Sequence, residues 1–166
     1  MEAEDIYLRS LAKRKERYRK QHAFCRYFYQ KLDEMMQYQT LMELKPALEW
    51  LIAYCEQIDG KEILSPMHGF MLYDLETMLY GLQHWTRIRS LIYAHGSIKQ
   101  VDIISELGLD KDRAGFFLYT LDRMGVIEKS KQGRYNVYVY VSERISEDKL
   151  RQSWWLFDET KRLPIE

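Results

Sequence analysis

The first 39 residues carry apolar positions in the repeat of an amphipathic helix and contain neither glycine nor proline. The spacing alternates steps of three and four, with Lys15 and His22 interrupting the stripe, so these positions share one side of a helix. A helix of this length would extend roughly 50 Å. We therefore expect it to pack on other helices or on a second copy of the chain. The stripe consists of Leu8, Leu11, Tyr18, Cys25, Tyr29, Leu32 and Met36.

Two start signals predict two more helices before residue 82. Pro46 suits the first turn of a helix, and Ser65 followed by Pro66 provides an N-cap and a first helical residue. Asp59-Gly60 should end the earlier of the two helices. An apolar stripe follows each start, with Ala47, Leu48, Leu51, Ile52, Cys55 and Ile58 in one and Leu72, Leu75, Met78, Leu79 and Leu82 in the other. Residues 1–82 are thus predicted to be entirely helical.

The pattern changes after Trp85, where short helices alternate with strand-like segments. Gly108 can take the left-handed conformation of a tight turn, Leu109 can fill the core, and Asp110 can cap the following helix. Gly125 ends that helix. The alternation in Val126–Lys129 and the β-branched and aromatic residues of 134–141 predict a β-hairpin with its turn at 130–133. The predicted helices are 86–94, 100–107 and 111–124, with a short strand at 97–99.

This order resembles the winged helix-turn-helix family over about residues 85–142. The stretches that carry the resemblance are QVDIISELGLDKDRAGFFLYTLDRMGVIEK and SKQGRYNVYVYV, which look like helix 2, turn, recognition helix and wing. In that family the third helix enters the DNA major groove, and the wing touches the backbone or the minor groove. The resemblance therefore implies a winged helix-turn-helix domain that binds double-stranded DNA.

The resemblance also assigns roles to individual residues. Ala114, Leu118 and Leu121, with Phe117, should face the core. The recognition-helix residues would be Arg113, Phe116, Tyr119, Thr120 and Arg123. The contacts to the DNA backbone from the turn and the wing would be Lys99, Gln100, Lys111, Lys129, Lys131 and Arg134.

Two aromatic residues depart from the usual pattern of a DNA-reading helix. Phe116 can contact a thymine methyl group and Tyr119 can bond a phosphate, but neither gives bidentate base recognition. Many domains of this shape bind proteins instead. A winged-helix adaptor with an aromatic third helix and a protein partner is therefore the alternative to a DNA-binding regulator.

Charge is balanced over the whole chain, with 25 basic and 25 acidic residues, so any affinity for DNA must come from local clusters. Residues 83–142 hold nine basic and six acidic residues. Residues 9–20 hold seven basic residues and one acidic residue. This cluster could lie on phosphates or could be a solvated helix face balanced by nearby acids. The contacts in the first case would include Lys13, Arg14, Arg17 and Lys20.

The sequence offers little for catalysis. It contains no phosphate-binding glycine loop, nucleophile elbow or HExxH motif, so we expect neither an enzyme nor a cofactor. His22, Cys25 and Cys55 could approach one another, but structural zinc sites usually have four ligands, and packing is the simpler role. The cysteine usage, with no CxxC pair, and the lack of a signal-peptide pattern favour the cytoplasm. The apolar runs are too short to span a membrane.

The C-terminal stretch 146–160 can form a helix with Leu150, Trp154 and Phe157 on one face. That face should pair in a homodimer or pack back on the N-terminal helices. We predict a mainly α fold with a helical segment for assembly or partner contact (1–82), a winged helix-turn-helix domain with a small β-hairpin wing (83–142) and a C-terminal helix (143–166). The predicted function is sequence-specific DNA binding by a dimer in the control of transcription or replication.

Overall fold

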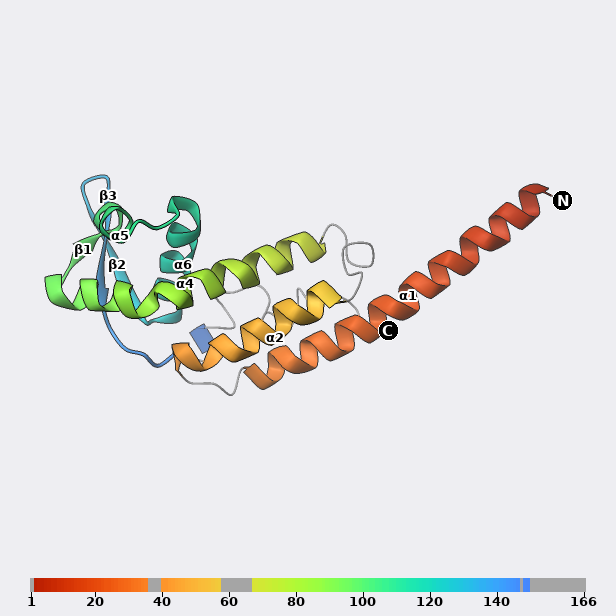
Figure 1. The fold of residues 1–166 in the computed structure, drawn as a ribbon, viewed down its shortest axis with the longest axis horizontal. Coiled ribbons are helices and arrows are strands. Elements are labelled where there is room, and N and C mark those ends of the chain that lie inside the picture. Colours follow the sequence, from red (N-terminus) through yellow and green to blue (C-terminus); the bar gives the residue numbers. More distant parts are fainter. Residues whose placement is uncertain (1, 36–39, 58–66, 147, 150–166) are drawn as a thin grey trace.

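The computed structural model of the chain describes residues 2–35, 40–57, 67–146 and 148–149 (Figure 1). These residues form a mainly α fold with one small antiparallel sheet, which confirms the predicted fold class. The predicted C-terminal helix with Leu150, Trp154 and Phe157 lies outside the described residues. The turn signals Asp59-Gly60 and Ser65-Pro66 lie outside them as well. Among the described residues, no helix is both long enough and apolar enough to cross a membrane.

Helix α1, Glu2–Met35, follows the predicted long helix. Acidic residues in its first turn favour this end, because they interact well with the positive end of the helix dipole. Its later part packs on α2, where the ring of Tyr27 lies 5.3 Å from that of Trp50 and 5.1 Å from that of Tyr54. The earlier part extends away from the rest of the described fold (Figure 1).

Helix α2, Leu44–Gln57, follows a short 3-10 turn at Leu41–Glu43 and packs along helix α4, Met67–His95. The contact is apolar on both sides, and burying each large side chain there contributes about 1.5–3 kcal/mol. Pro46 lies in the first turn of α2, where its missing N–H costs no helical hydrogen bond. The buried side chains of this contact are Leu44, Leu48, Leu51, Ile52, Cys55, Leu75, Met78 and Leu82.

Helix α4 continues without a break through the point where we predicted one helix to end and another to begin. The prediction of a separate helix at 86–94 was wrong. Gln83, His84 and Trp85 contain no helix-breaking residue, and Trp85 is fully buried in the middle of the helix. The predicted domain boundary after residue 82 falls inside α4, and one hydrophobic cluster contains residues from both sides of it.

Beyond α4 the elements follow the predicted order. They are β1 (Ile98–Lys99), α5 (Gln100–Leu107) and α6 (Lys111–Met124). Gly108 ends α5 with a left-handed φ of 63°, a conformation that glycine adopts without steric cost. The carboxylate of Asp110 then accepts a hydrogen bond of 2.9 Å from the Arg113 amide and caps α6.

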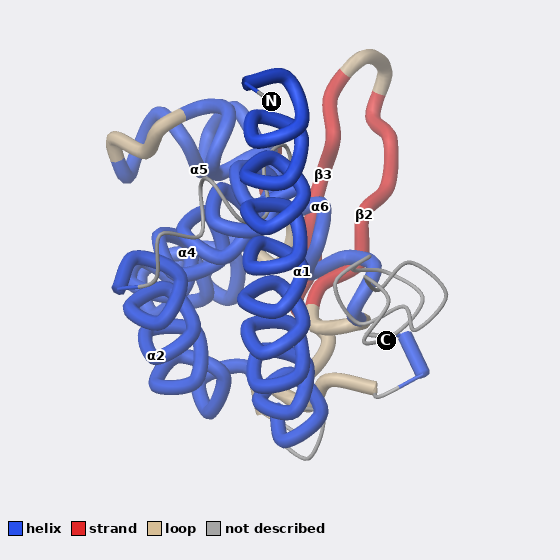
Figure 2. Tube along the Cα trace, turned by 90° about the vertical axis from the view of Figure 1, so that its right-hand side faces the viewer, coloured by secondary structure: helices blue, strands red, loops and turns tan. Residues whose placement is uncertain are grey.

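Strands β2 (Ile127–Gln132) and β3 (Tyr135–Tyr140) form the predicted hairpin, and β1 pairs with β3 on the other side. The turn lies at Gly133 and Arg134, so β2 is longer than the sequence suggested. Gly133 takes a φ of 63°, which the tight two-residue turn requires. The hairpin extends beside the helices as a separate two-stranded arm (Figure 2).

The segment after β3 is hydrogen-bonded to the segment that precedes α2. Leu41 donates its amide to the Glu143 carbonyl at 3.1 Å, and Thr40 forms a β-bridge with Arg144. The Glu143 carboxylate accepts hydrogen bonds from the Trp85 indole at 3.2 Å and from Arg89 at 2.8 Å. The chain leaving the sheet is thereby fixed to the segment that precedes α2 and to α4.

Candidate nucleic-acid interface

Basic and aromatic side chains meet where α6 lies beside β2. Tyr119 of α6 is 45% exposed, and the charged groups of Arg123 and Lys129 lie 5.6 and 5.7 Å from the centre of its ring. Arg123 also donates a hydrogen bond of 3.3 Å to the Tyr119 hydroxyl. Side chains alternate along a strand, so Lys131 projects on the same side of β2 as Lys129. We call Phe116, Tyr119, Arg123, Lys129 and Lys131 the α6–β2 surface.

A second basic and aromatic cluster lies on the other face of the hairpin. The ring of Tyr135 lies between Lys99 and Arg134, at 4.5 and 5.1 Å from their charged groups. Arg134 also donates a hydrogen bond of 2.9 Å to the Tyr135 hydroxyl. Lys99 pairs with Val137, whereas Lys129 pairs with its neighbour Tyr138. The predicted wing contacts are therefore divided between two faces rather than gathered on one.

Two residues predicted to contact DNA make hydrogen bonds within the fold. Thr120 is only 3% exposed, and its hydroxyl donates to the Phe116 carbonyl at 2.8 Å. Gln100 accepts a hydrogen bond of 2.9 Å from the Tyr138 hydroxyl and a longer one from Asn136, which fixes the start of α5 on β3. The Thr120 hydroxyl is thus bonded within its own helix, and the Gln100 amide oxygen is bonded to β3. Contact of either residue with DNA stays a prediction.

The remaining predicted residues of α6 differ in their surroundings. Phe116 is partly buried and packs against the core. Arg113 lies 5.5 Å from the ring centre of Tyr80, so it faces α4 rather than Tyr119. Asp112 is exposed one helical turn before Phe116. Beside β2, the positive charge of α6 therefore comes from Arg123 at its C-terminal end.

The basic groups predicted outside this region lie apart from it. Lys111 is exposed at the start of α6. Lys13 and Arg14 are exposed on the part of α1 that extends away from the sheet (Figure 1). The side chains of Arg17 and Lys20 lie outside the described part of the structure. The basic cluster of α1 and the α6–β2 surface are thus two separate regions.

The prediction missed Tyr135, which the structure places between two cations. Its signals in the sequence were local, because a basic residue precedes it directly and the expected β-hairpin would bring a further strand beside it. We had assigned Lys99 and Arg134 as isolated phosphate contacts. The aromatic ring between them makes them one cluster.

The metal hypothesis gains nothing from the described residues. Burial raises the pKa of the Cys55 thiol to about 12, and the nearby Glu56 adds to this effect. A thiol that stays protonated is a poor metal ligand. The side chains of His22 and Cys25 lie outside the described part, and within that part no three potential ligands cluster.

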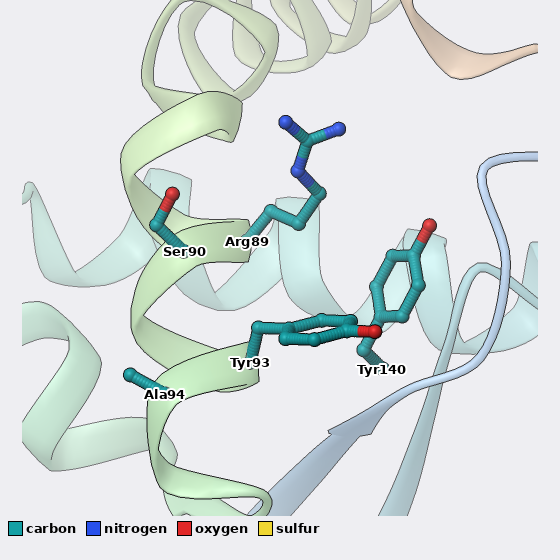
Figure 3. A pocket seen from close by; sticks show the side chains of 5 residues that line it. All are labelled: Arg89, Ser90, Tyr93, Ala94 and Tyr140. Carbon is teal, nitrogen blue, oxygen red and sulfur yellow. The ribbon is translucent and has the colours of Figure 1, made fainter.

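An open pocket of about 570 Å³ lies between α4 and β3 (Figure 3). It is lined by Arg89, Ser90, Tyr93 and Ala94 from α4 and by Tyr140 from β3. The rings of Tyr93 and Tyr140 meet edge to face at 5.6 Å. The single charged lining group, Arg89, is paired with Glu143 at 2.8 Å. Burial and the Glu143 carboxylate raise the pKa of Tyr140.

Comparison of the chain with models of known protein families, with curated protein sequences and with solved structures finds no match in any of the three.

Proposed function

We propose that the protein is a DNA-binding regulator of the winged-helix type that acts as a homodimer in the control of transcription or replication. The observation that carries the proposal is the α6–β2 surface, where Arg123 and Lys129 flank the exposed ring of Tyr119. Arginine, lysine and tyrosine are common donors to DNA phosphates. The surface combines such donors with a helix that follows a tight turn and with a β-hairpin beside it, as DNA-binding domains of this type do.

In this mechanism, α6 lies along the major groove and the hairpin follows the adjacent backbone. Arg123, Lys129 and Lys131 neutralise phosphates, and the Tyr119 ring holds two of these cations in place through cation–π contacts. Thr120 is buried and Arg113 faces α4, so reading of sequence falls to Phe116 and Arg123. Most of the affinity would come from the phosphates.

Titration of fluorescent duplex DNA at several salt concentrations tests the proposal. Lys129→Ala and Lys131→Ala should each weaken binding severalfold and reduce the slope of log affinity against log salt by about one. Lys45→Ala on α2 is the matched control and should leave both quantities unchanged, because Lys45 lies on a different helix from the surface. If the wild-type protein does not bind DNA even at low salt, the proposal is wrong.

A protein-binding adaptor is the competing function, and Tyr119 is the observation in its favour. Its ring is 45% exposed, and Asp112 on the same helix would repel phosphate. An adaptor predicts that Tyr119→Ala abolishes capture of a protein partner and that Lys131→Ala does not. DNA affinity that falls with both variants supports the regulator instead.

A further inference from the structure

The first half of α1 has an apolar side that no other described element covers. Tyr7 is 65% exposed and Leu8 is 53% exposed, and Leu11 is partly exposed. Among the described side chains of α1, the ring contacts with α2 are those of Tyr27. Figure 1 shows this half of the helix extending away from the rest. A single helix is marginally stable in water, and most helical stability comes from packing of the apolar face.

Two opposite charges bracket this apolar side. Residues 4, 8, 11 and 15 follow steps of four, three and four, so Glu4 and Lys15 lie on the same side of the helix as the two leucines. Both charged residues are exposed. Along the helix, the side therefore presents an acid, two leucines and then a base. When a second copy of this helix runs antiparallel, its base lies opposite the acid of the first copy and its leucines lie opposite the leucines.

We propose that this side of α1 binds the same side of α1 in a second copy of the chain, with the two helices antiparallel. Leu8 then packs beside Leu11 of the second copy, and Glu4 lies opposite Lys15 of the second copy. The two-fold symmetry repeats each contact, as in other isologous interfaces. The pairing forms a short antiparallel coiled coil with a self-complementary charge pattern.

The same charges argue against other occupants. A parallel pair would place Glu4 against Glu4 and Lys15 against Lys15, and like charges at facing positions are destabilising. A nucleic acid on this side would meet Glu4, with Glu2 and Asp5 in the same turn, and would leave Tyr7 and Leu8 without a role. A second copy of α1 would make favourable contacts with the acidic residue, the leucines and the basic residue of this side.

This inference rests on the homodimer of the proposed function but not on DNA binding. A measurement of mass in the absence of DNA therefore separates the two. A monomeric protein that still binds DNA would overturn the pairing and the homodimer but not DNA binding, whereas a dimer without DNA affinity would overturn DNA binding alone.

Sedimentation velocity of the full chain over a range of concentrations provides the test. Glu4→Lys and Lys15→Glu should each raise the dimer dissociation constant about tenfold or more at low salt, because each variant turns two attractive pairs into repulsive ones. The double variant E4K/K15E should restore the dimer. Mixing the two single variants should give a heterodimer, which differently tagged chains would reveal.

Matched controls lie on the opposite side of the same helix. Glu2→Lys and Lys13→Glu have the same charge changes and the same sequence separation, and we expect neither to change the dissociation constant. Leu8→Ala should weaken the dimer, whereas Ile6→Ala should not, although Ile6 is 67% exposed. Circular dichroism would check that each variant keeps its helix.

Several results would overturn the proposal. One is a chain that stays monomeric at every concentration, as it would if its own C-terminal segment covered α1. Another is a dimer that Glu4→Lys leaves unchanged or that the double variant fails to restore, which would indicate a parallel pair or a different surface. Dimerisation that occurs only with DNA would assign the basic cluster to nucleic acid instead.

Discussion

Tyr138 and Cys55 bring ionisable groups into the core, and both are held in their neutral forms. Tyr138 is 1% exposed and donates its hydroxyl hydrogen to Gln100 at 2.9 Å. Burial and then the Asp122 carboxylate raise its pKa from 10.0 to about 12. The pKa of the Cys55 thiol rises from 9.0 to about 12, mainly through burial. Both groups therefore make the stability of the folded chain depend on pH in the alkaline range.

We predict that stability falls as the pH rises from about 9 to 12. Below pH 9 both groups keep their protons in the folded and unfolded states, so their contribution is fully present. Above it the unfolded chain loses these protons first, which favours unfolding and costs on the order of a few kcal/mol by pH 12. Urea unfolding across this range should show a shallower decline for Cys55→Ala and for Tyr138→Phe. Tyr7→Phe, which removes an exposed hydroxyl, should keep the wild-type slope, and equal slopes in all variants would contradict the prediction.

Residues with local signals were predictable, and residues defined by packing were not. The left-handed Gly108 and the capping Asp110 depend on their own stretch of chain, and the structure confirms both. Thr120 and Gln100 look like any exposed polar residues in the sequence. The Thr120 hydroxyl bonds to a carbonyl one turn earlier in its own helix, but its burial depends on how α6 packs, and the Gln100 bond depends on how α5 packs on β3. No local pattern specifies this packing.

At the scale of elements, the crossing of α4 and α6 depends on one missing side chain. A Cβ atom at Gly81 would lie 1.9 Å from Cδ1 of Phe117, which is far inside contact distance. Phe117 is fully buried and also meets the Trp85 ring edge to face at 6.2 Å. The two helices can approach this closely only because α4 carries glycine at the crossing.

We predict that Gly81→Ala lowers the free energy of unfolding by about 1–3 kcal/mol, because the added methyl group overpacks the crossing. Alanine is the better helix former, so helix propensity alone would give the opposite sign. Chemical denaturation would measure the change. Gln83→Ala, at an exposed site of α4, should stay within about 0.5 kcal/mol. In a Phe117→Leu background the cost of Gly81→Ala should shrink, and an undiminished cost would point away from this contact.

The bounds of α5 and α6 were easier to predict than those of α4. Both short helices end at left-handed glycines, and α6 also begins at the capping Asp110, so these bounds follow from the sequence. In α4, Gly81 lies within the helix and the change of pattern near Trp85 suggested two helices. The helix continues because its buried face is shared by α2, α6 and the sheet, a property of the assembled core.

At the scale of the whole molecule, one hydrophobic cluster runs from Leu41 to Ile145. It includes the apolar side of α2, both halves of α4, and the buried faces of α6 and the sheet. At one edge of this cluster, the Glu143 carboxylate accepts hydrogen bonds from Trp85 and Arg89, and the Glu143 carbonyl accepts one from the Leu41 amide. These contacts link the helical part to the hairpin part across the predicted boundary at residue 82.

We therefore predict cooperative unfolding of α2 and α6. Leu48→Ala in α2 should cost about 2–5 kcal/mol, since it removes a fully buried side chain. Hydrogen exchange measured by mass spectrometry should then show faster global exchange of the α6 amides as well, although α6 is unchanged. Glu49→Ala, at an exposed neighbour, should leave α6 protection as it is. Unchanged α6 protection in Leu48→Ala would mean that the two parts unfold separately.

The length of α1 has a consequence for the spacing of DNA sites. In the antiparallel pairing the two-fold axis passes near residues 9 and 10, about 38 Å of helix from Met35 in each copy. Packing of α1 on α2 includes Tyr27, which is nearer the axis than Met35, so the two folded bodies would lie about 50 Å apart at this residue. In each of them the α6–β2 surface lies farther out (Figure 1). Adjacent half-sites in the DNA of common dimeric regulators lie one turn, about 34 Å, apart. Such a dimer would span half-sites more than one turn apart, or would hold two distant sites together in a loop.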